Sequence, residues 1–145
     1  MFISYLRCIF ALLIDKINNR NKVMMDFKYK AKRIDNDEWV KGNLLVQRYR
    51  GKERYYIGYV QNGSINGFEV NPKTVCISTL LNDDRGVSIW YGDILQEIRT
   101  GETYVVSYEC SHKGCFSLTK NGFYEGVFGE ITEPMHCEVI GNIYD

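Results

Sequence analysis

Short runs of alternating apolar and polar residues, separated by turn residues, fill the chain from residue 27 onward. Alternation with a period of two is typical of half-buried β-strands, and a spacing of about 8–12 residues between runs is typical of a barrel or sandwich. No long helical period follows residue 25, which argues against alternating strands and helices. The predicted strands are 27–33, 39–49, 55–60, 68–70, 74–77, 87–90, 94–98, 103–109, 115–118 and 137–144, and 123–131 fits either a strand or one helical turn. The pattern predicts a mainly β fold: a small antiparallel β-barrel or pseudo-barrel.

Glycine, asparagine and aspartate mark the turns between these strands, since the chain has 13 Gly but only 2 Pro. Asn-Gly pairs favour two-residue hairpin turns because both residues tolerate a positive φ. The predicted turns are 35–37, 50–52, 62–63, 66–67, 82–86, 92–93 and 121–122.

The first 24 residues follow a different pattern. Apolar side chains recur at helical spacing over residues 1–17, which predicts an amphipathic helix. Its longest apolar run, residues 8–14, is much shorter than the roughly 20 residues that span a bilayer, and no signal-peptide cleavage site follows. Three interpretations remain open: a helix packed on the domain, an interfacial membrane helix, or an extension upstream of a natural start at Met24 or Met25. The predicted organisation is an N-terminal extension, 1–24, and one β domain, 25–145.

Composition agrees with one soluble globular domain. Of the 145 residues, 45% are hydrophobic and 25% charged, and 18 basic residues balance 18 acidic ones. A net charge of zero argues against a dedicated DNA-coating protein, although a local basic patch is still compatible with it.

Cysteine and histidine are the first candidates for chemistry. The five cysteines are odd in number and irregular in spacing, which favours reduced thiols over a disulfide framework. Cys110, His112, Cys115, His136 and Cys137 could form a zinc shell or a Cys–His nucleophilic pair. Paired Cys-x-x-Cys motifs, a phosphate-binding loop and a nucleophile elbow are all missing from the sequence. We therefore predict no catalytic residue, no metal site and no cofactor.

A basic and aromatic segment surrounds the predicted hairpin turn at 50–52. Arg and Lys can neutralise phosphates, and Tyr can stack on unpaired bases. The candidate nucleic-acid-binding residues here are Arg48, Tyr49, Arg50, Lys52 and Arg54, within the segment 48–56. A solvated hairpin whose tyrosine rings pack into the core is the alternative that we favour.

Three lysines in the first predicted strand extend this candidate site. Lys28, Lys30 and Lys32 alternate, so they share one face of a strand and would form a basic stripe facing water. Such a stripe could contact nucleic acid, or it could protect an edge strand from aggregation.

Three blocks of sequence resemble the YopX family, which occurs in bacteriophages, prophages and their bacterial hosts. They are FKYKAKR and IDNDEWVKG at 27–42, the segment 69–94 from EVNPKTV to IWYGDI, and VIGNIY at 139–144. Leu80 stands where the family commonly has Gly, and Trp90 replaces the usual Tyr or Phe. The resemblance covers about residues 25–145 and implies a small SH3-like β-barrel fold. The matched residues look like scaffold, with Asp83 and Gly86 in a turn and Gly141 near a bulge.

Three functional hypotheses follow for a protein of the bacterial cytoplasm. The first is a non-enzymatic phage or prophage accessory protein that binds a host or phage protein or a second copy of itself, with the strand at 103–109 available for pairing. The second is a nucleic-acid-binding barrel that uses the hairpin at 48–56. An enzyme built on the cysteines and histidines is a third hypothesis.

Overall fold

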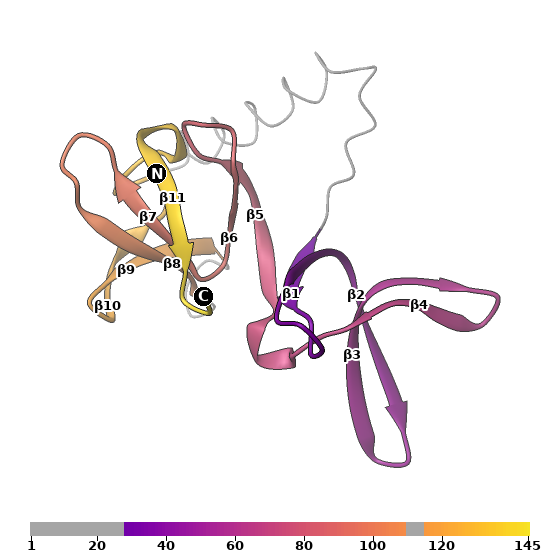
Figure 1. Ribbon diagram of the computed structural model, residues 1–145. Helices are drawn as coiled ribbons and strands as arrows, with labels where there is room; N and C mark the ends of the chain where they lie inside the picture. Colours follow the sequence, from indigo (N-terminus) through magenta and orange to yellow (C-terminus); the bar gives the residue numbers. More distant parts are fainter. Residues whose placement is uncertain (1–27, 110–114) are drawn as a thin grey trace.

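The computed structural model describes residues 28–109 and 115–145, and all regular structure in these residues is strand or short 3₁₀ turn. The strands form two antiparallel sheets, which confirms the predicted mainly β fold (Figure 1). They are β1 (Tyr29–Lys32), β2 (Trp39–Tyr49), β3 (Lys52–Gln61), β4 (Ser64–Glu69), β5 (Cys76–Asn82), β6 (Ser88–Trp90), β7 (Asp93–Glu97), β8 (Thr103–Glu109), β9 (Cys115–Lys120), β10 (Phe123–Val127) and β11 (Cys137–Asn142). The 3₁₀ turns are η1 (Pro72–Thr74) and η2 (Pro134–His136).

The second sheet, in the order β10-β9-β8-β7-β11, curls into a half-barrel that holds the larger core. Alternating residues of its strands point inward, together with a residue from β6 and one from the loop after β10. The buried residues of this core are Ile89, Leu95, Tyr104, Val106, Leu118, Phe128 and Cys137. This core is the barrel-like part of the predicted architecture.

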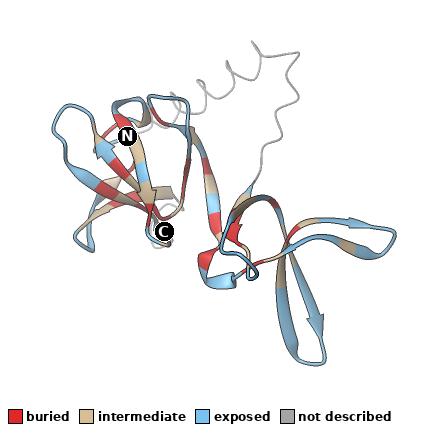
Figure 2. Cartoon of the chain, in the orientation of Figure 1, coloured by how far each residue is buried: buried red, intermediate tan, exposed pale blue. Residues whose placement is uncertain are grey.

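The first sheet has the order β4-β3-β2-β1-β5-β6 and joins two separate regions of the molecule. Its strand β5 pairs with β1 at one end and with β6, beside the half-barrel, at the other (Figure 1). A smaller core of Ala31, Ile57 and Val70 lies where β1 meets β3. The hairpins β2–β3 and β3–β4 project beyond this core, and most of their residues are exposed (Figure 2).

Turn chemistry accounts for the projecting hairpins. Asn62 and Gly63 have φ of 50° and 76°, and Arg50 and Gly51 have 48° and 73°, as the two central residues of a tight hairpin turn require. Both turns were predicted, but the turn predicted at 66–67 is wrong because both residues lie inside β4. Gly67 is required there for close approach: a Cβ atom on it would lie 2.4 Å from the carbonyl oxygen of Ile57.

Several other expectations are corrected by the pairing of the strands. The segment β1 lies between β2 and β5, so it is no edge strand, and β8 lies between β7 and β9, so it cannot pair with another chain. The ambiguous segment 123–131 forms β10 followed by a turn, and the residues at 72–74 are a 3₁₀ turn before β5. The expected N-terminal helix lies outside the described residues.

The unequal cores predict unequal sensitivity to truncation. Replacing the fully buried Leu95 by Ala removes apolar contacts and leaves a cavity, and should lower the free energy of unfolding by about 2–5 kcal/mol. Val60→Ala on the projecting β3, where the side chain is 60% exposed, should change it by less than about 0.5 kcal/mol. Urea unfolding followed by Trp fluorescence measures both, and equal losses would contradict the assignment of the main core to the half-barrel.

Candidate binding surface

The tip of the β2–β3 hairpin presents the basic and aromatic side chains that the sequence singled out. The register pairs Arg48 with Glu53 and Tyr49 with Lys52, and every residue from 46 to 54 is exposed. The Arg50 guanidinium lies 5.1 Å from the Tyr49 ring centroid, within cation–π range. The alternative interpretation was a solvated hairpin whose tyrosine rings pack into the core. The cations are solvated as it predicts, but Tyr49 is 65% exposed and does not pack into the core.

The cations at this tip differ in their partners. Arg48 Nε donates to Glu53 Oε1 at 2.7 Å, and Arg54 Nε lies 4.0 Å from Glu69 Oε1. Hydrogen bonds from Tyr55 and Arg48 lower the pKa of Glu53, which keeps this carboxylate charged. Arg50 and Lys52 have no carboxylate within 4 Å among the described residues. These two cations are therefore the ones free to meet an external anion.

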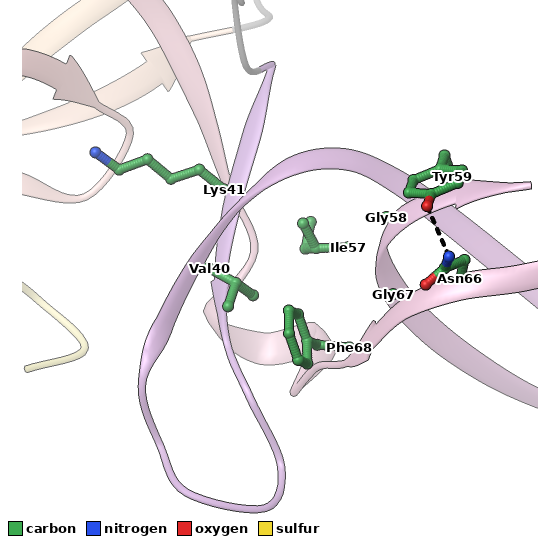
Figure 3. A pocket seen from close by; sticks show the side chains of 8 residues that line it. All are labelled: Val40, Lys41, Ile57, Gly58, Tyr59, Asn66, Gly67 and Phe68. Carbon is green, nitrogen blue, oxygen red and sulfur yellow. Dashed lines mark hydrogen bonds between the residues drawn. The ribbon is translucent and has the colours of Figure 1, made fainter.

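The β3–β4 hairpin adds a second, largely apolar surface that the sequence analysis missed. Val40, Ile57 and Phe68 line an open hollow of about 330 Å³ beside Gly58 and Gly67, and Lys41 is its one charged lining residue (Figure 3). The side chain of Asn66 donates to the Tyr59 hydroxyl at 2.6 Å, which fixes that exposed ring. The sequence contained a signal for this surface. Residues 55–68 contain no charged residue; four of them are aromatic, and a fifth residue typical of β-strands, Ile57, lies next to a glycine.

The lysine stripe predicted on the first strand does not face water. Lys28 is exposed, but Lys30 and Lys32 are each only 9% exposed, so the water-facing prediction is wrong for these two residues. Lys32 Nζ lies 3.3 Å from an Asp37 carboxylate oxygen. The face that carries these lysines is covered by aromatic rings: Lys30 Nζ lies 5.6 Å from the Trp90 ring centroid, and Lys32 Nζ lies 5.5 Å from that of Trp39.

Lys30 instead forms a buried polar cluster between the two sheets. Its Nζ donates to Asp93 Oδ1 at 2.9 Å, the same oxygen accepts from Asn142 Nδ2 at 2.8 Å, and Asp93 Oδ2 accepts from the Trp90 backbone N–H at 2.7 Å. The ammonium also lies 4.7 Å from the Trp39 ring centroid. We call Lys30, Asp93 and Asn142 the inter-sheet cluster; it fastens β1 of the first sheet to β7 and β11 of the second.

The last residue of the chain closes this region from outside. Trp39 Nε1 donates to Asp145 Oδ1 at 2.9 Å, and Asn142 N–H donates to Asp145 Oδ2 at 2.8 Å. The hydrogen bond from Trp39 lowers the pKa of Asp145. The aromatic ring and the carboxylate thus cover the buried ion pair.

The thiols and imidazoles show no assembled reactive site within the described residues. Cys110 and His112 lie outside them, and no group of three potential metal ligands occurs in residues 28–109 and 115–145. Cys76 and Cys137 are buried, and burial raises the pKa of Cys76 to about 11 and raises that of Cys137. Both therefore stay protonated at neutral pH, which makes them poor nucleophiles.

Within the part of the chain that the structure describes, no helix has the length and apolar character to cross a membrane.

Fold and surface together define a class: a mainly β protein in which a half-barrel carries a second sheet with two projecting hairpins. The YopX protein family model matches residues 16–145, so the chain belongs to the YopX family, as its sequence blocks indicated. The match begins upstream of the predicted boundary at residue 25. None of the curated proteins compared with the chain matches it.

The inter-sheet cluster predicts a large cost for removing one partner. The Asp93 side chain is 1% exposed and that of Lys30 is 11% exposed, so Asp93→Ala leaves a buried cation without its anion. The free energy of unfolding should fall by about 3–5 kcal/mol. Arg48→Ala breaks the exposed pair with Glu53 and should leave stability nearly unchanged. Denaturant unfolding compares the two, and a similar effect of both changes would contradict a stabilising role for the cluster.

The buried thiols predict selective modification. Because a raised pKa means that the thiolate forms only at higher pH, Cys76 and Cys137 should resist iodoacetamide at pH 8, whereas the half-exposed Cys115 should react. Site-resolved mass spectrometry of the native protein measures this. Rapid labelling of Cys76 under native conditions would contradict its burial, and labelling in urea provides the control for intrinsic reactivity.

Proposed function

We propose that this YopX-family protein is a non-enzymatic phage or prophage accessory protein of the bacterial cytoplasm, which binds an acidic surface of a host or phage protein through the tip of its β2–β3 hairpin. The observation that supports this most directly is the segregation of charge along the chain. Residues 28–75 hold ten Lys and Arg against five Asp and Glu, whereas residues 76–145 hold four against eleven. The net charge of zero therefore hides a basic part and an acidic part.

The hairpin itself supports a binding role. A two-stranded ribbon without a core is marginally stable in water, and the tip of β2–β3 exposes Val46 and Tyr49 together with its cations. Tyr and Arg are the residue types most enriched among those that dominate binding energy at protein interfaces. Contact with an acidic partner would bury the Tyr49 ring and neutralise Arg50 and Lys52.

Nucleic acid is the second candidate, and one observation favours it. Arg50 stacks on Tyr49 at an exposed tip, an arrangement that also suits phosphate contact and base stacking. With Lys30 and Lys32 buried, such binding would depend on Lys28 and on the hairpin residues. We favour a protein partner because a long polyanion would also approach the acidic residues of 76–145 and be repelled there.

The test is capture of partners by the full-length chain, tagged at its N-terminus, from its bacterial host, with and without nuclease. Arg50→Ala/Lys52→Ala should reduce recovery of a stoichiometric partner on the order of tenfold, because two cations of the proposed interface are lost. Lys73→Ala/Arg99→Ala removes the same charge at exposed sites away from the tip and should have no effect.

The outcomes separate the candidates. A protein that resists nuclease and is lost only with the tip variant supports the proposal. Partners that disappear with nuclease move nucleic acid to first place. Equal recovery by both variants overturns the role of the hairpin tip.

A further inference from the structure

The open edges of the two sheets differ in how they are protected against pairing with another chain. Natural edge strands are kept apart by shortness, bulges, charged residues or proline. The edge strand β6 has three residues, and the edges β10 and β11 each contain a register shift. The part of β2 that extends past β1 ends in the basic hairpin tip.

The edge strand β4 lacks these protections over residues 64–68, and its one charged residue, Glu69, lies at its end. It is six residues long, pairs with β3 without a register shift, and contains no Lys, Arg or Pro. It forms the outer margin of the six-stranded sheet (Figure 1). This makes β4 the described edge best suited to accept a further strand.

Backbone alternation identifies which groups of β4 point outward. The Val70 N–H bonds the Tyr55 carbonyl, so even-numbered residues of β4 bond β3 and odd-numbered ones face away. The outward carbonyl of Glu69 accepts from the Ile34 N–H at 3.1 Å. The outward N–H and C=O groups of Ile65 and Gly67 have no hydrogen-bond partner among the described backbone groups.

Charge distinguishes the candidate occupants of this edge. Identical surfaces can meet only where like charges do not oppose each other, and residues 55–68, which form most of the β3–β4 hairpin, contain no charge. An acidic partner would instead meet the basic tip of β2–β3. Neutrality thus favours a second copy of this chain on β4.

The sequence of β4 is also compatible with antiparallel pairing between two copies of this strand. In an antiparallel pair centred on Asn66, Ile65 of each copy lies opposite Gly67 of the other, so their outward groups form hydrogen-bonded pairs. The apolar Ile65 side chain then lies over a residue without a Cβ. The same register brings Gly63 of one copy opposite Glu69 of the other, beside a hollow of about 320 Å³ lined by Arg33, Ile34, Asp35, Gly67, Phe68 and Glu69.

We propose that two copies of this protein pair antiparallel through β4, joining their six-stranded sheets across a twofold axis at Asn66, with each hairpin turn seated in the hollow beside the other copy's Glu69. This interface is separate from the basic tip of the β2–β3 hairpin. It therefore stands or falls independently of the proposed protein partner.

Sedimentation equilibrium of the full-length chain over a range of concentrations tests the proposal. The expected result is a dimer whose dissociation constant changes little with salt, because residues 64–68 at the centre of the interface carry no charge and Glu69 lies opposite the uncharged Gly63 of the other copy. Ile65→Pro removes the outward N–H while β4 keeps its bonds to β3, and should weaken the dimer by roughly tenfold or more, since two symmetry-related bonds are lost.

Val60→Pro is the matched control. Val60 of β3 lies directly opposite Ile65 of β4. Its N–H points away from β4, toward the side of β3 that pairs with β2, but this pairing ends at Gly58, so the N–H of Val60 has no partner in β2. This variant should remain dimeric, with the same circular dichroism as Ile65→Pro. Hydrogen exchange gives a second measurement: the Ile65 and Gly67 amides should be protected at high protein concentration and lose that protection on dilution.

A monomer at every concentration overturns the proposal; a strand from another protein would then be the candidate partner of β4. A dimer that Ile65→Pro does not weaken, or that both proline variants weaken equally, overturns the assignment of the interface to this edge. Rapid exchange of the Ile65 and Gly67 amides in a dimer overturns it as well.

Discussion

The arrangement of this molecule depends on one buried ion pair, between Lys30 and Asp93. A lysine ammonium in an apolar interior is costly unless its charge is compensated, and Asp93 meets this requirement while also accepting from Asn142 and from the Trp90 backbone. The three side chains come from β1, β7 and β11, so the same bonds that satisfy the charge hold the two sheets together. The hydrogen bonds of the inter-sheet cluster therefore orient the small core of the first sheet and the projecting hairpins relative to the half-barrel.

The strands and most of the turns could be predicted from the sequence because their signals are local. Alternation and Asn-Gly pairs need only neighbouring residues, and the hairpin turn at Asn62-Gly63 follows from them. The second Asn-Gly pair shows the limit of this reasoning. Asn66 and Gly67 have turn chemistry, yet they lie within β4, because close contact with β3 requires a glycine at position 67.

The site could be predicted only in part, because strand order and long-range pairing are not local properties. The cations of the β2–β3 tip are exposed as expected, because the residues next to a hairpin turn in sequence lie at the end of the hairpin. Lys30 looks like a surface residue in sequence, and its partner Asp93 lies 63 residues away. Only the fold shows that β1 and β8 lie inside their sheets and that β4 lies at a margin.

The separation of basic and acidic residues has a consequence for how the molecule meets anything charged. A neutral chain with a basic region and an acidic region has an electric dipole, and a dipole turns in the field of an approaching charged surface before contact. Collisions that present the hairpins to an acidic surface are thereby enriched over random ones. Association should then be fast at low ionic strength and slower as salt shortens the range of the field, with little change in the lifetime of the complex once formed.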